Sequence, residues 1–232
     1  MKRLVVDIET IPEGTDVTTP EEAKKAALDA LTGRIVCIGF ITVDEFEAQS
    51  AVSIVAEDEK KLLSDFWSML RRENIKSFVA HNGLSFDLPY IWKRSVINQV
   101  RPSIQLDLRR YRNDFVYDTM CVWGNWEIRG NASLNALASA FGLGAKIGSG
   151  DQVLQLWREH RHREIAEYCL QDCWLTYQCY ARMNFSRATE RAAVKQTIFT
   201  EQKPVPDEIT GVAGARQVAG AATCVQVAGM TS

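Results

Sequence analysis

Two carboxylates stand one residue apart near the start of the sequence, in "LVVDIETIPEG", where Asp7 and Glu9 follow an apolar run. The run predicts a strand over residues 2–8, and because residues i and i+2 of a strand point to the same face, the two acids project together. Neighbouring carboxylates repel each other unless a cation lies between them. The pair is interpreted either as a hydrated strand end or as part of a Mg²⁺ or Mn²⁺ site, since these ions prefer carboxylate oxygens.

Two further acids lie in apolar segments later in the chain. Asp87, in "HNGLSFDLPYI", comes after a predicted short strand and at the start of a predicted helix, where an aspartate commonly serves as a cap. Asp172, in "IAEYCLQDCWLTY", is expected mid-helix on or close to the buried stripe, which is a costly position for an aspartate. Tyr168 lies four residues earlier and therefore on the same face of the helix. Asp172 is the acid that a purely structural role explains least, and it favours the metal-site interpretation.

The elements that must position these acids alternate between strands and helices. Apolar periodicity and turn residues predict strands over residues 2–8, 34–43, 47–56, 77–81 and near 115–120. The same reasoning predicts helices over residues 19–33, 57–74, 131–143 and 163–193, and a loop that leads into a further helix within residues 82–97. The first three strands are expected to form a meander. The order predicts one α/β domain with a mixed sheet of about five strands flanked by helices.

The composition is that of an ordinary globular protein, with 232 residues of which 46% are hydrophobic and 24% are charged. No apolar run approaches the roughly 20 residues of a membrane span, and no signal segment is recognised, so we expect a cytoplasmic protein with no membrane partner. The six cysteines are interpreted as buried reduced thiols. A zinc site on Cys169 and Cys173 with His160 or His162 is the weaker interpretation, because no compact four-ligand set emerges.

The acidic segments together resemble the DEDD 3′–5′ exonuclease superfamily, whose fold is RNase H-like. Within it, the chain is most similar to the stand-alone proteins related to the exonuclease domain of family B DNA polymerases. "DIET", "HNGLSFDLPYI" and "YCLQD" match the three motifs in order, and a tyrosine four residues before the last aspartate matches the tyrosine subclass (DEDDy). The similarity covers roughly residues 1–183. We therefore predict an exonuclease domain over residues 1–199, followed by an Ala/Gly/Val-rich tail or edge element over 200–232.

The resemblance implies a two-metal hydrolysis of phosphodiester bonds that releases nucleoside 5′-monophosphates. Asp7, Glu9, Asp87 and Asp172 would hold two Mg²⁺ or Mn²⁺ ions, and Tyr168 would orient the attacking water. Main-chain groups around Glu9 and Thr10 would meet the 3′-OH. The resemblance indicates DNA as substrate, with a single-stranded or unpaired 3′ end. A 3′–5′ exoribonuclease or oligonucleotide trimmer is the alternative, since no residue visibly reads a 2′-OH. A non-catalytic nucleic-acid-binding module is a weaker alternative, because all four acids and the tyrosine are present.

Basic and aromatic residues gather in one part of the sequence, although the net charge is −2, from 27 basic and 29 acidic side chains. The group consists of Lys93, Arg94, Arg101, Arg109, Arg110, Arg112, Trp92, Tyr111 and Phe115. This pattern suits a single nucleic-acid strand, and equally a solvated helix face followed by a basic loop. As substrate contacts we single out Arg94 and Arg110. Asn82 and Phe86 are expected at the terminal nucleotide, although Phe86 equally suits the core, and Lys146 is expected at a phosphate.

Overall fold

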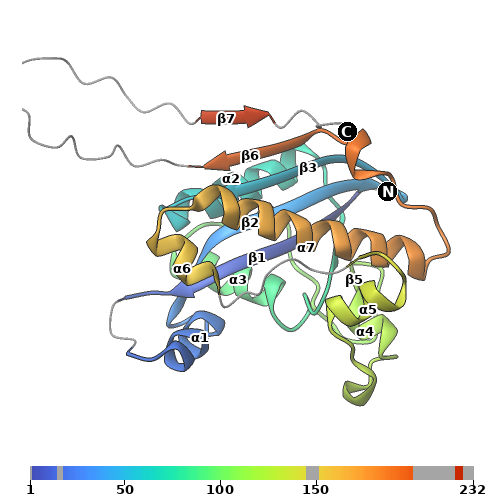
Figure 1. Ribbon diagram of the computed structural model, residues 1–232, viewed down its shortest axis with the longest axis horizontal. Helices are drawn as coiled ribbons and strands as arrows, with labels where there is room; N and C mark the ends of the chain where they lie inside the picture. Colours follow the sequence, from blue (N-terminus) through green and yellow to red (C-terminus); the bar gives the residue numbers. More distant parts are fainter. Residues whose placement is uncertain (1, 15–17, 145–151, 201–222, 227–232) are drawn as a thin grey trace, which may run out of the picture.

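A seven-stranded sheet forms the centre of the molecule (Figure 1). The computed structural model describes residues 2–14, 18–144, 152–200 and 223–226. The strands lie in the order β5-β4-β1-β2-β3-β6-β7. Their bounds are β1 Lys2–Pro12, β2 Gly33–Asp44, β3 Glu47–Val55, β4 Ser77–Ala80, β5 Val116–Asp118, β6 Gln196–Thr200 and β7 Thr223–Gln226.

The pairing of the strands makes the sheet mixed, as the sequence predicts. Strands β1, β2 and β3 form the expected antiparallel meander. Strand β4 runs parallel to β1 and β5 parallel to β4, while β6 runs parallel to β3 and antiparallel to β7. The two strands beyond the predicted set, β6 and β7, extend the sheet on the β3 side. The predicted domain boundary after residue 199 stays a prediction, because residues 201–222 lie outside the described part.

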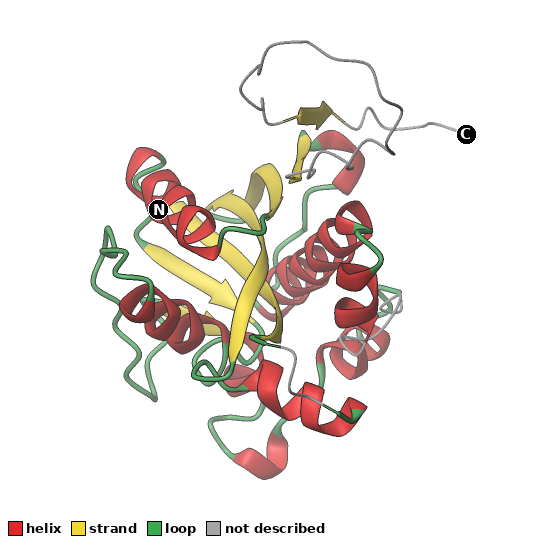
Figure 2. Cartoon of the chain, turned by 90° about the vertical axis from the view of Figure 1, so that its left-hand side faces the viewer, coloured by secondary structure: helices red, strands yellow, loops and turns green. Residues whose placement is uncertain are grey.

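Helices cover both faces of the sheet (Figure 2). Helices α2 and α3 pack on one face, and α7 crosses the other with α5 and α6 beside it (Figure 1). The helices are α1 Pro20–Leu28, α2 Glu59–Arg72, α3 Asp87–Ile97, α4 Thr119–Trp123, α5 Leu134–Ala140, α6 Val153–Arg158 and α7 His162–Met183, with short 3₁₀ turns at Ile128–Gly130 and Arg191–Ala193. This α/β architecture confirms the predicted fold class and is consistent with an RNase H-like fold.

Alternation along β1 decides which face receives the acids. Leu4, Val6 and Ile8 are buried in the hydrophobic cluster that includes residues of α2 and α3. Val5 instead packs in the cluster that includes buried residues of α7. Because successive side chains of a strand point to opposite faces, odd-numbered residues of β1 face α7.

Helix α7 is shorter than the sequence predicts. It ends at Met183, whereas the apolar pattern predicts a helix that continues to residue 193. Beyond the end, Phe185 has a positive φ of 54°, and the N–H of Ser186 donates to the carbonyl of Ala181 at 2.9 Å. A left-handed residue that closes the last turn in this way ends a helix, and an isolated apolar pattern does not reveal it. The chain then returns to the sheet as β6, which begins just beyond the predicted helix and is not among the predicted strands.

Candidate active site

The candidate active site lies at the carboxyl ends of three neighbouring parallel strands, β1, β4 and β5. Strand β4 pairs with β1 as far as Val5, and Asp118 is the last residue of β5. Asp7 and Glu9 therefore lie just beyond the paired part of β1, and the segment 81–87 leaves the end of β4. Since the carboxyl ends of parallel strands meet at the same edge, acids from three separate segments come together here.

The first two acids sit beside an irregularity in β1. The register between β1 and β2 shifts between Glu9 and Thr10, which marks a β-bulge. Glu9 is only 8% exposed, and Asp7 is half-buried. One ligand atom each from Asp7, Glu9 and Cys169 lie within 4.8 Å of one another. The two acids thus lie on the α7 side of the sheet, as the alternation of β1 requires, and Glu9 is not the hydrated strand end of the first interpretation.

Asp87 reaches the same place from the other side of β1. It is the first residue of α3 and is 4% exposed. Its Oδ1 accepts a 3.1 Å hydrogen bond from the main-chain N–H of Ile8, the residue between the first two acids. The N-cap of α3 is Phe86, which makes no side-chain capping bond. Asp87 is therefore not the N-cap of the helix, and its carboxylate is tied to β1.

Helix α7, which packs on one face of the sheet, carries the two remaining predicted residues, Tyr168 and Asp172. Asp172 is 4% exposed, and Tyr168 lies one turn earlier in a half-buried position. The Sγ of Cys169, between them, lies 3.5 Å from Oδ2 of Asp7 and 3.4 Å from its carbonyl oxygen. The helix can approach this closely because β2 carries a glycine: a Cβ on Gly39 would come within 2.8 Å of the Cys169 sulfur.

The pKa of Asp87 shows the effects of burial and of the neighbouring acids. Burial raises the pKa of this carboxyl to about 7, and the negative charges of Asp118 and Asp172 act in the same direction. Hydrogen bonds from its own N–H and from the N–H of Ile8 act against the increase without cancelling it. A carboxyl with such a pKa holds a proton through much of the neutral range unless positive charge is supplied. The carboxylate oxygens of the four predicted acids are the ligands that hard divalent cations prefer, while the Cys169 sulfur beside Asp7 and Glu9 is a soft donor.

Asp118 is a fifth acid at the site, which the sequence reasoning did not single out. It is fully buried, and its carboxylate accepts hydrogen bonds from four main-chain N–H groups at 2.9–3.3 Å. The donors are Asn82, Leu84, Met120 and Cys121. Asp118 thereby caps α4 and holds the loop before Asp87. Its signal in the sequence was a second apolar run that ends in an acid, "FVYDT", similar to the run before Asp7.

The loop that Asp118 holds contains the two residues predicted at the terminal nucleotide. Asn82 has a positive φ of 65°, and its carbonyl accepts hydrogen bonds from the N–H groups of Ser85 and Phe86. Phe86 is half-buried and packs against Tyr90, with ring centroids 5.3 Å apart. Both residues lie in the segment that leads directly into Asp87. Phe86 therefore contributes partly to the core, and a contact with substrate stays a prediction for both side chains.

Thr10 lies directly after the bulge in β1 and is half-buried. Its hydroxyl hydrogen-bonds with that of Tyr90, whose pKa is raised by burial. The Tyr90 hydroxyl also donates to the carbonyl of Ala27 at 2.9 Å. The end of β1 is thus tied to α3 and α1, which steadies the main chain of Glu9 and Thr10 at the edge of the site.

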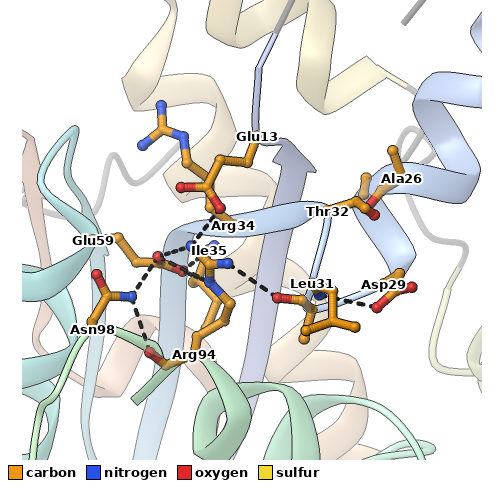
Figure 3. A network of polar contacts seen from close by, with 12 residues as sticks. Glu13, Ala26, Asp29, Leu31, Thr32, Arg34, Ile35, Glu59, Arg94 and Asn98 are labelled. Carbon is orange, nitrogen blue, oxygen red and sulfur yellow. Dashed lines mark hydrogen bonds and ion pairs between the residues drawn. The ribbon is translucent and has the colours of Figure 1, made fainter. Parts of the chain in front are cut away.

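Arg94 does not have the role that the sequence suggested. It is 2% exposed, and its guanidinium pairs with the buried Glu59 at 2.6 Å and with Glu13 at 2.9 Å (Figure 3). Its Nη1 donates to the carbonyl of Ala30 at 3.0 Å. The predicted contact with substrate is wrong, because a guanidinium enclosed by carboxylates and a carbonyl offers no donor to a phosphate. Spacing along α3 could not reveal this, since Glu59 and Glu13 come from distant segments.

Glu59 is the centre of this buried network. Besides Arg94, it accepts hydrogen bonds from the N–H of Ile35 at 2.7 Å and from the side-chain amide of Asn98 at 2.8 Å (Figure 3). The carboxylate thereby joins the first residues of β2 to α2 and α3. A buried ion pair with its remaining atoms hydrogen-bonded in this way is one whose disruption is costly. Arg94 is thus a structural residue of the buried network around Glu59.

The other predicted basic contacts lie on the surface or beyond the described residues. Arg110 is exposed in the loop before β5, close enough to Cys121 to influence its pKa. Its neighbours Arg109 and Arg112 are paired with Asp107 and Asp114, respectively, so part of the basic character of the loop is neutralised locally. Lys146 lies outside the described residues.

One comparison with known proteins decides the family. A family model described as "Predicted 3'-5' exonuclease related to the exonuclease domain of PolB" matches residues 28–204. The chain belongs to this family. The matched range of the exonuclease contains Asp87, Tyr168 and Asp172, whereas Asp7 and Glu9 precede it. The link between Asp7 and Glu9 and the acids of the matched range therefore rests on the folded structure.

Two further findings concern the exonuclease as a whole. No curated protein matches its sequence significantly. Among the helices in the described parts of the chain, none is both long and apolar enough to cross a membrane.

Proposed function

We propose that this exonuclease is a divalent-metal-dependent member of the tyrosine subclass that hydrolyses DNA from single-stranded or unpaired 3′ ends. The observation that carries the proposal is the linkage of four acids from a strand and two helices. Asp7 and Glu9 lie close together, the N–H of Ile8 between them binds Asp87, and the charge of Asp172 acts on Asp87. Such a concentration of buried carboxylates is unfavourable without a cation. The products are nucleoside 5′-monophosphates.

The donor set supports a pair of hard divalent cations. The four carboxylates would hold two Mg²⁺ or Mn²⁺ ions, and the pKa of about 7 for Asp87 is what a site short of positive charge should have. Bound there, the ions would lower the pKa of the attacking water and stabilise the leaving 3′ oxygen. Asp87 would then be ionised, because the added positive charge offsets the cost of burial and the smaller repulsion from Asp118 and Asp172.

The remaining residues of the site position the reacting groups. Tyr168 would orient the water through its hydroxyl, since a tyrosine with an ordinary pKa near 10 is a poor base at neutral pH. The main chain at the bulge between Glu9 and Thr10 would hold the terminal 3′-OH. The half-buried Asn82 and Phe86 would contact the terminal nucleotide, and Arg110 would contact a phosphate further along the strand. DNA is proposed because the family is related to a DNA polymerase exonuclease domain.

An exonuclease assay tests the proposal. Strands of DNA and RNA labelled at the 5′ end, with free or blocked 3′ ends, are incubated with Mg²⁺, Mn²⁺ or EDTA. We expect stepwise shortening of unblocked DNA with either metal and none in EDTA. Undiminished cleavage in EDTA, or of the blocked strand, would contradict the mechanism. Faster trimming of RNA than of DNA would favour the exoribonuclease alternative.

A further inference from the structure

A second group of metal-ligand side chains lies away from the carboxylate cluster. Glu57 stands between β3 and α2, His160 lies in the turn between α6 and α7, and His162 is the first residue of α7. One ligand atom from each of the three lies within 4.8 Å of the other two. Ligands held about 2.0–2.1 Å from one zinc ion lie about 3.3 Å apart, so a small rotation of the side chains closes the set.

The donor chemistry of this group differs from that of the active site. Two imidazoles and one carboxylate suit a borderline cation of the Zn²⁺ type, whereas an all-carboxylate set suits Mg²⁺ and Mn²⁺. We propose that Glu57, His160 and His162 form a second metal site, separate from the catalytic carboxylates, which binds one Zn²⁺ ion. His160 is exposed, so the fourth coordination position opens to solvent.

The backbone of His160 is held by the turn that ends α6. Its φ is +55°, in the left-handed region, at the position just past the end of α6. Two main-chain bonds close that turn, from His160 to the carbonyl of Trp157 at 3.1 Å and from Arg161 to that of Leu156 at 2.9 Å. Glycine and asparagine are the most frequent residues at this position, and histidine is also enriched among residues with a positive φ. The turn therefore accommodates His160 and fixes where its side chain leaves the main chain.

The surroundings hold the ligands in place. His162 is 6% exposed and stacks on the ring of Trp157, with centroids 4.6 Å apart. The guanidinium of Arg34 lies over the Trp157 ring, 5.0 Å from its centroid. It also donates a 2.9 Å hydrogen bond to the carbonyl of Glu57. Arg34 thereby ties the main chain of Glu57 to the ring that packs on His162.

The two histidines and the cysteines of α7 have different neighbours. A Cβ on Gly39 would meet the sulfurs of Cys169 and Cys173 at 2.8 and 3.1 Å, so both thiols face β2. The histidines instead face Glu57, at the opposite end of β3 from its turn with β2. A bound ion would link the β3–α2 connection to the first turn of α7, ahead of Tyr168 and Asp172. α6 lies alongside this turn (Figure 1).

Metal titration of the whole chain tests the proposal. The protein is freed of metal, supplied with saturating Mg²⁺ and titrated with Zn²⁺, with stoichiometry, calorimetry and melting temperature as readouts. His160→Asn keeps a residue that tolerates the left-handed turn, and Glu57→Gln keeps the shape of the side chain. At 100 times the Kd, we expect Zn²⁺ to raise the melting temperature of the wild type by roughly 5–10 °C. Both variants should bind this ion at least about 10-fold more weakly.

Two controls separate this site from the catalytic one. Asp172→Asn removes a proposed catalytic ligand and should leave this Zn²⁺ site intact. His160→Asn should hydrolyse DNA with Mg²⁺ at the wild-type rate when no zinc is added. Equal zinc stoichiometry and affinity in the wild type and His160→Asn would overturn the proposal, as would loss of all zinc binding in Asp172→Asn. Neither result depends on whether the carboxylate cluster hydrolyses DNA.

Discussion

The main-chain N–H of Ile8 donates a 3.1 Å hydrogen bond to Oδ1 of Asp87. This bond joins the residue between the first two acids to the start of α3, so β1 and α3 cannot shift independently at the site. It also partly offsets the unfavourable burial of Asp87. The site is thus held in shape by main-chain contacts, while its charges remain unfavourable without a cation.

Asp87→Asn should stabilise the metal-free protein above pH 7. Between about pH 4 and 7 the folded protein keeps a proton on Asp87 that the unfolded chain releases, so wild-type stability falls as the pH rises through this range. The amide lacks this titration, and we expect a gain of about 1–4 kcal/mol at pH 8. Urea unfolding at pH 4 and pH 8 in EDTA measures it. Parallel pH dependence of the two proteins would contradict the prediction.

Loss of a catalytic ligand should remove activity and leave the fold. Loss of an outer-shell partner of a metal site typically costs about 10- to 100-fold. Because Asp7 and Asp172 are proposed as direct ligands, we expect Asp7→Ala and Asp172→Ala to lower the rate of DNA hydrolysis by more than about 100-fold. Tyr168→Phe keeps all four carboxylates and should lose about 10- to 100-fold. Single-turnover rates measure both, with circular dichroism as the control for folding. A Tyr168→Phe variant slower than Asp172→Ala would show that the tyrosine does more than orient water.

Asp118→Ala should destabilise the protein through the loop before Asp87. The change leaves four main-chain N–H groups without their shared acceptor, and we expect a loss of about 3 kcal/mol or more. Asp118→Asn is the matched control. It retains Oδ1, which accepts from Asn82, Met120 and Cys121, and loses only the bond from Leu84. Equal unfolding midpoints for the two variants in urea would rule out this role.

Arg94→Met should destabilise the fold without a specific effect on substrate binding. The change leaves the buried carboxylate of Glu59 without its cation, which typically costs about 3–5 kcal/mol. Lys93→Met, at the exposed neighbouring position, should change stability by less than about 0.5 kcal/mol. Thermal unfolding compares the two. Unchanged stability combined with weaker DNA binding in Arg94→Met would restore the substrate role that burial excludes.

Arg110→Ala should weaken the binding of a DNA strand in a salt-dependent manner. One lost phosphate contact lowers the slope of log K against log salt concentration by about 0.7 for a single strand. Arg109→Ala is the control, because that guanidinium is paired with Asp107 and should contribute less. Fluorescence anisotropy with EDTA present measures binding without cleavage. Identical slopes for the wild type and Arg110→Ala would remove Arg110 from the interface.

Much of the fold can be predicted from local patterns of apolar residues in the sequence. The apolar runs of β1, β2 and β3 and the stripes of the helices predicted the meander, the helical layers and the mixed sheet. β6 lies just beyond the predicted end of the last helix, in a stretch whose side-chain pattern did not predict a strand. The predicted end of α7 is wrong because the apolar pattern continues past the left-handed Phe185, where the backbone ends the helix.

The sequence by itself identified the candidate residues: the acids at 7, 9, 87 and 172, and the tyrosine one helical turn before the last. Only the tertiary structure decided what each charge faces. Arg94 and Asp118 have side chains as polar as any on the surface, yet one lies against Glu59 and the other against four main-chain N–H groups. Local spacing records periodicity along one element, whereas desolvation and charge pairing depend on segments that meet only when the sheet and its helices assemble.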